Sequence, residues 1–224
     1  MMNFLKKQLW LQKNDFLQIA AVWCGGFALI LLLEHLAYLW MNRDAEQLSA
    51  YPVASLVMLV AGILVLLIIG WMRFGVEFRM GLQMGATRRQ MIAAELWLCL
   101  WQNLLGLSLT ALFLWLEVRV ILPALWPTVP MDLDLLAELP LWFWPLALVL
   151  TTLAGPVLGA LSERLGRWAM LLWWLPCVLM RPITDGLLDL PAADLQRLGL
   201  GALAVFAAAL VWSLHRLLHT SSAQ

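Results

Sequence analysis

Long runs of apolar residues recur along the chain and are separated by short polar stretches. A helix needs about 20 predominantly apolar residues to cross a hydrocarbon core of about 30 Å. Six runs are candidate spans, of which the fifth is short and contains Pro176. The predicted spans are 16–40, 51–72, 91–116, 141–161, 168–180 and 198–218. Because lipid cannot satisfy backbone hydrogen bonds, the pattern predicts an all-α, polytopic membrane protein, a single transmembrane domain over residues 1–224.

Composition and charge agree with this class. Apolar residues make up 63% of the chain and charged residues 12%, against about half and a quarter in soluble domains. The formal net charge is zero, so total charge gives no sign of a nucleic-acid partner, and we expect none. The cysteines, Cys24, Cys99 and Cys177, lie far apart in apolar runs, with no CxxC and no Cys/His cluster. We therefore predict neither a disulfide framework nor a metal site.

The basic residues are distributed unequally between the two sides that six spans define. One side holds ten of them: Lys6, Lys7, Lys13, Arg73, Arg79, Arg88, Arg89, Arg164, Arg167 and Arg216. The other side holds four: Arg43, Arg119, Arg181 and Arg197. Because Lys and Arg accumulate on the cytoplasmic side, this bias predicts that both termini are cytoplasmic.

Four polar stretches outside the spans have some helical character. Residues 1–15 have an apolar face opposite lysines, which predicts an interfacial helix on the membrane lipid. Residues 123–140 and 182–197 are predicted to be short external amphipathic segments. Residues 73–90 are predicted to contain a short amphipathic helix that faces the cytosol between spans 2 and 3.

The end of segment 73–90 carries a helix-start signal. Thr87 and Gln90 match a capping box, with Thr87 as the N-cap of span 3. Arg88 and Arg89 then fall in the first helical turn, where positive charge opposes the helix dipole at a cost of about 0.3–1 kcal/mol each. A locally unfavourable choice of this kind indicates another requirement: membrane orientation, a negatively charged partner surface or lipid headgroup, or both together.

Several polar side chains fall inside the predicted spans, where burial is costly unless they are paired. Glu34 and His35 either line a proton or substrate path or lie at headgroup level. Gln102 and Asn103 either bond between helices or face a cavity. For Glu95 we expect a local ion pair with Arg88 or Arg89.

Small residues also mark the fourth predicted span. Gly155 and Gly159 are four residues apart and so share a helix face, which permits close approach of a second helix. Pro156, beside Gly155, is expected to bend that helix.

The chain lacks the short motifs of common enzymes. It contains no GxxxxGK[ST], HExxH or GxSxG motif, so we predict no catalytic residues and no intrinsic ATP hydrolysis. His215 and His219 have a spacing that can hold a metal, but no third ligand is evident.

The stretch FRMGLQMGATRRQM, residues 78–91, resembles the segment between the second and third spans of bacterial ABC-2-type transporter permeases. The likeness is specific over residues 79–90 and extends in outline over the whole chain. A similar stretch occurs in permeases of the lipoprotein-release and cell-division group, which have four spans and a large external domain after the first. Only residues 41–50 separate the first two spans here, so the six-span class fits better.

The resemblance implies the membrane subunit of an exporter in the bacterial plasma (inner) membrane. The 73–90 segment would be a coupling helix that docks into a dimer of separate ATPase subunits, which would bind ATP and Mg²⁺. A second permease chain, identical or related, would complete the complex, and this chain would bind no cofactor. The implied docking residues are Phe78, Leu82, Met84 and Gly85, with Thr87 beside them and Arg79, Arg88 and Arg89 at the rim.

Two other functions stay open at this point. One is an intramembrane enzyme that uses Glu34, His35 and Glu95 as acid and base groups. The other is an assembly or sensor subunit that docks through the same cytoplasmic helix and transports nothing itself.

Overall fold

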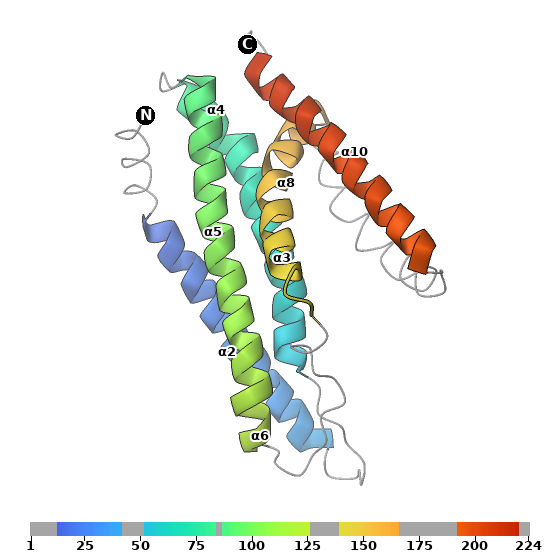
Figure 1. Ribbon diagram of the computed structural model, residues 1–224. Helices are drawn as coiled ribbons and strands as arrows, with labels where there is room; N and C mark the ends of the chain where they lie inside the picture. The colour runs from blue at the N-terminus through green and yellow to red at the C-terminus, as the bar shows by residue number, and fades with distance from the viewer. Residues whose placement is uncertain (1–12, 42–51, 84–86, 126–138, 166–191, 220–224) are drawn as a thin grey trace. The chain divides into compact units, whose positions relative to one another are not determined.

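The computed structural model describes residues 13–41, 52–83, 87–125, 139–165 and 192–219 (Figure 1). Within these ranges the secondary structure is helical, and no strand occurs. The long helices are α2 (Lys13–Met41), α3 (Val53–Met72), α5 (Arg88–Leu116), α8 (Phe143–Leu165) and α10 (Ala192–His219). The shorter elements are η1 (Arg73–Glu77), α4 (Phe78–Gln83), η2 (Glu117–Ile121) and α6 (Leu122–Leu125).

Five of the described helical stretches are long and apolar enough to cross a membrane, so the fold is that of a multi-pass helical membrane protein. The five are Asn14–Ala37, Val53–Gln83, Arg88–Leu125, Phe143–Ser162 and Leu200–His219. They correspond to five of the six predicted spans. The remaining predicted span, 168–180, lies outside the described residues, as do residues 1–12 of the predicted interfacial helix.

The two central helices run further than the apolar runs predict. The span expected to end at Met72 continues through the π-helical turn η1 and α4 to Gln83. The span expected to end at Leu116 continues through a second π-helical turn, η2, to Leu125. Charged residues do not end these helices because Arg73 and Glu117, which begin the two π-helical turns, are buried with polar partners.

The described chain divides into two compact units, each with its own packing. Unit 1 comprises the described parts of residues 1–69 and 96–152, and unit 2 those of residues 70–95 and 153–224. Helices α3, α5 and α8 therefore contribute to both units.

The core of unit 1 is built around Trp23 on α2. Its indole packs against Gly62 on α3 and Gly106 on α5, where the missing side chains leave room for the ring. Its Nε1 donates a hydrogen bond to Thr110 Oγ1 at 3.0 Å, so the buried indole N–H is satisfied. One turn further along α2, Phe27 stacks on Phe113 with ring centroids 4.4 Å apart.

The core of unit 2 is built around Phe74 in η1, which is fully buried. Its ring and backbone lie against α8, where Gly155 and Gly159 leave a notch. A Cβ atom at Gly159 would lie 2.4 Å from Phe74 Cβ, and one at Gly155 would lie 3.0 Å from Phe74 Cδ2. The predicted close approach at these two glycines is confirmed, and α8 continues as a helix through Pro156.

Candidate functional site

The described parts of the predicted cytoplasmic segment form a polar end on the α3–α5 hairpin. We call Phe78–Gln83 together with Thr87–Arg89 the basic end. Arg79, Thr87 and Arg89 are exposed there, and Leu82 and Arg88 are half-buried. Met84 and Gly85, two of the predicted docking residues, lie outside the described residues.

Phe78 differs from the docking role that the resemblance implies for it. Its side chain is 2% exposed and lies beside Phe74, with the ring centroids 6.3 Å apart. Gly81, which follows on the same helix, lies so close to α5 that a Cβ atom there would overlap the Met91 side chain. Phe78 therefore anchors α4 within unit 2, and the exposed part of the basic end consists mainly of polar side chains.

The predicted capping box at the start of α5 is confirmed. The Gln90 backbone N–H donates to Thr87 Oγ1 at 3.4 Å, and the Thr87 N–H donates to Gln90 Oε1 at 3.3 Å. The reciprocal bonds satisfy two backbone donors at a helix N-terminus. They fix the direction in which α5 leaves the basic end.

Arg88 bonds across to another helix rather than to Glu95. Its Nη1 donates to the backbone carbonyl of Leu217 at 3.1 Å, near the end of α10. A cation is favourable there because the last carbonyls of a helix carry partial negative charge. The expected ion pair between Glu95 and Arg88 or Arg89 was wrong, since spacing along one helix does not reveal partners on another.

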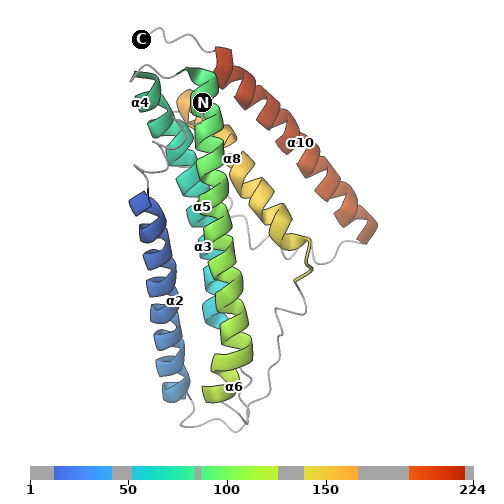
Figure 2. The same ribbon diagram turned by 60° about the vertical axis from the view of Figure 1, so that its left-hand side comes forward.

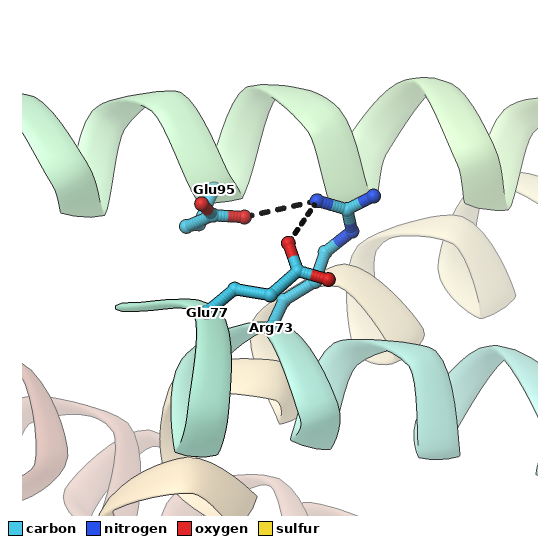
Figure 3. A network of polar contacts seen from close by, with 3 residues as sticks. All are labelled: Arg73, Glu77 and Glu95. Atoms are coloured by element: carbon cyan, nitrogen blue, oxygen red, sulfur yellow. Dashed lines mark hydrogen bonds and ion pairs between the residues drawn. The ribbon is translucent and has the colours of Figure 1, made fainter. Parts of the chain in front are cut away.

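The partner of Glu95 is Arg73, which begins η1 (Figure 3). Arg73 Nη1 lies 3.0 Å from Glu95 Oε2 and also 3.0 Å from Glu77 Oε2. Arg73 and Glu95 are buried, at 2% and 1% exposure, while Glu77 is about one-third exposed. We call these three residues the Arg73 cluster. It ties the end of the first helix of the hairpin to the beginning of the second.

A second polar cluster, in unit 1, lies where α3 begins. The fully buried carboxylate of Glu117 accepts hydrogen bonds from the N–H groups of Ala54 and Ser55, at 3.2 and 2.6 Å, and from the Ser55 hydroxyl. Glu34 on α2 accepts from the same Ala54 N–H at 3.2 Å. The first turn of α3 is thus capped by carboxylates of two other helices, where negative charge is favoured.

Glu117 was missed by sequence reasoning because it directly follows the apolar run that ends at Leu116 and so lies outside the predicted span. The one signal for it was its position directly after a long span, with Arg119 two residues further. Glu34, by contrast, was singled out, and the structure gives it a capping contact with α3. His35 beside it is half-buried.

The polar pair in the middle of α5 is buried inside unit 1. Gln102 and Asn103 are each 1% exposed. Asn103 Nδ2 donates to Thr152 Oγ1 on α8 at 3.1 Å, which realises the interhelical alternative for this residue. Both side chains are buried between packed helices. They could line a translocation path only if α5 and α8 separate.

Metal-ligating side chains do not gather in the described residues. No group of three or more His, Cys, Asp or Glu there could hold a metal ion. The rings of His215 and His219, on exposed positions of α10, lie with centroids 4.5 Å apart.

The fold defines a multi-pass helical membrane protein. In its described residues, three charged side chains, Arg73, Glu95 and Glu117, are buried in polar contacts where helices begin or end. No protein-family model, curated protein or solved structure matches the chain.

Proposed function

We propose that the chain is the membrane-spanning permease subunit of an ATP-driven exporter of the ABC-2 type, coupled through its basic end to a separate ATPase. The observation that carries the proposal is the construction of that end. Arg79 and Arg89 are exposed on the basic end, and the buried side chain of Phe78 fixes α4 against the core of unit 2. The Arg73 cluster and the Thr87–Gln90 capping box hold the same segment from either side.

A coupling element must transmit force from a soluble subunit to membrane helices, so it has to be stiff and continuous with a span. The helical stretch from Val53 to Gln83 meets this requirement, because α4 is joined to α3 without a loop. The buried contacts of Phe74 with α8 extend the connection to another helix. A force on α4 would therefore reach α3, α5 and α8 together.

Six spans with both termini on one side are supported by the directions of α8 and α10 in unit 2. Ser162, near the end of α8, adjoins Gly75 in η1, and Leu217, near the end of α10, bonds Arg88. Both helices therefore run toward the same end of the unit, which both views show (Figures 1 and 2). The residues between them include the predicted fifth span, 168–180, which would return the chain to the opposite side of the membrane.

With six spans, the bias of Lys and Arg supports a cytoplasmic position for the basic end, and we propose that the chain lies in a bacterial plasma membrane. The chain carries no phosphate-binding loop, so ATP and Mg²⁺ would be bound by the partner ATPase dimer. A second permease chain would complete the transport pathway. We propose that this pathway is lined by Glu34, His35, Gln102 and Asn103, which become exposed when α2, α5 and α8 separate.

An intramembrane enzyme built on Glu34 and Glu95 is less well supported. Glu34 bonds at the beginning of α3, whereas Glu95 bonds Arg73 just beyond its end. The 19 residues from Ala54 to Arg73 correspond to about 28 Å of helix. The two carboxylates belong to different units, and each is engaged in polar contacts of its own unit.

The proposal is tested by purifying the chain from its native membrane and reconstituting it with the P-loop ATPase that accompanies it. We expect the double charge reversal Arg79→Glu/Arg89→Glu to abolish both co-purification and stimulation of ATP hydrolysis by the chain. Arg119 is an exposed arginine in η2 that is predicted to lie on the external side. Arg119→Glu is therefore the control variant and should change neither co-purification nor ATP hydrolysis.

Two results would overturn this assignment. One is that no P-loop ATPase co-purifies with the wild-type chain, and the other is full association of the charge-reversed variant. An ATPase-dead partner separates transport from assembly: if it binds the chain but stops export, the chain is a permease. If export of every substrate tested is unaffected, the chain is a docking or sensor subunit.

A further inference from the structure

The Arg73 cluster contains two bonds of different character on one nitrogen atom. Arg73 Nη1 lies 3.0 Å from a carboxylate of its own helix, Glu77, and 3.0 Å from a carboxylate of α5, Glu95 (Figure 3). The first bond moves with the helix, whereas the second joins two helices. Only the second must break if the basic end moves away from α5.

The local helix geometry brings both acceptors to the same arginine. Arg73 and Glu77 are the first and last residues of η1, a π-helical turn of five residues. A π-helical turn inside an α-helix holds one extra residue, and such turns are frequent where a helix changes register at functional sites. In η1, Phe74 is seated against Gly159 of α8 while the neighbouring Arg73 bonds α5.

The two carboxylates also differ in their access to water. Glu95 is 1% exposed, and Glu77 is about one-third exposed. Breaking a buried ion pair is costly mainly because it leaves a charge buried and unpaired. Glu77 removes that cost for Arg73, because the guanidinium keeps one carboxylate when it leaves the other. Glu95 lies seven residues, about two turns, from the first residue of α5, so water from the polar end reaches it once the junction opens.

We propose that Arg73 is a two-partner clamp that releases Glu95 and keeps Glu77 when α4 moves away from α5. The inference rests on the proposed function for its role, which is to let the basic end move with an attached ATPase. The clamp itself is a property of this chain and is testable without any partner. Arg73 is then a positioning residue, and Glu77 is the group that makes its movement reversible.

The clamp is tested by measuring the distance between spin labels on α4 and α5. Met80 is exposed and Ala93 is half-buried, and both lie in unit 2. Each accepts a label as a cysteine once Cys24, Cys99 and Cys177 are replaced. We expect Glu95→Gln, in lipid nanodiscs, to shift the population toward a longer Met80–Ala93 distance than that of the wild type. We expect Glu77→Gln to keep the short distance and to reduce any longer population below that of the wild type.

The two variants give different results only if the carboxylates have different roles. An unchanged distance in Glu95→Gln would show that the bond to α5 does not hold the junction, and the clamp would be wrong. A shift in Glu77→Gln equal to that in Glu95→Gln would show that both carboxylates are simple ties, which would also exclude the exchange of partners.

A purely stabilising role is separated by the double variant Arg73→Met/Glu95→Met. A well-packed apolar pair often replaces a buried ion pair without loss of stability. The variant is therefore expected to keep the short distance and to bind the ATPase, but to lose the ATP-dependent change in distance. A wild-type ATP response in this variant would overturn the clamp. If no ATPase associates with any version of the chain, the proposed function fails, while the spin-label result still decides the clamp.

Discussion

The contact between Gly159 and Phe74 makes a quantitative prediction about helix packing. A Cβ atom at Gly159 would lie 2.4 Å from Phe74 Cβ and 2.8 Å from the Phe74 carbonyl carbon. Neither atom can move by rotation of a side chain, so Gly159→Ala must push α8 away from η1. Overpacking of this kind costs about 1–3 kcal/mol. The better helix propensity of alanine returns up to about 1 kcal/mol.

Gly201→Ala is the matched control, because nothing lies within 4 Å of a Cβ atom at that position on α10. The propensity gain is common to both substitutions, so their difference isolates the clash. We expect Gly159→Ala to be less stable than Gly201→Ala by about 1–3 kcal/mol in free energy of unfolding. The assay is reversible unfolding in detergent followed by the fluorescence of the 14 tryptophans.

Gly155→Ala provides an internal check on the cause. Its nearest atoms are Cδ2 and Cε2 of the Phe74 ring, at 3.0 and 3.2 Å, so a smaller side chain at residue 74 relieves the contact. Phe74→Leu should therefore couple favourably with Gly155→Ala and leave the penalty of Gly159→Ala unchanged. Equal stability of Gly159→Ala and Gly201→Ala within about 0.5 kcal/mol would refute the reasoning.

Three further predictions concern single polar contacts. Thr87→Ala removes the N-cap of α5 and should cost about 1 kcal/mol, seen as faster hydrogen exchange in the first turn of that helix. Glu117→Ala leaves the buried N–H and hydroxyl groups of Ser55 without their acceptor and should cost about 1–3 kcal/mol per unsatisfied group, whereas Glu117→Gln keeps one acceptor oxygen and should cost less, both measured by unfolding in detergent. Thr110→Val removes the acceptor of the buried Trp23 N–H while it keeps the size of the side chain, and it should cost about 1–3 kcal/mol; a value near zero would mean that the indole N–H contributes nothing.

The helices and two local motifs could be predicted from the sequence because their causes are local. Five predicted spans recur as helices, since an apolar run of about 20 residues marks where a chain can cross a membrane. The Thr87–Gln90 capping box and the Gly155–Gly159 notch are set by residues three or four apart. Such spacings translate directly into positions on a helix.

Partners on different helices could not be predicted, because sequence alone does not give the register between helices. Glu95 lies seven residues from Arg88 on one helix, yet its partner is Arg73 on another. The same limit explains the helix ends. Arg73 and Glu117 interrupt the apolar pattern, so the spans were expected to end before them. Their buried partners remove the cost that makes charge a stop signal.

The two arginines at the start of α5 now have different explanations. Both oppose the helix dipole at that position. Arg88 regains favourable electrostatics by donating to the Leu217 carbonyl at the negative end of α10, so its presence follows from the fold. Arg89 is exposed, and no described contact offsets its position. Packing therefore does not explain why an arginine stands at position 89. An acidic partner surface should have its largest effect at this residue. Single charge reversals separate the two roles: Arg88→Glu should loosen the end of α10, whereas Arg89→Glu should leave the helices intact and weaken only the attachment of the proposed ATPase partner.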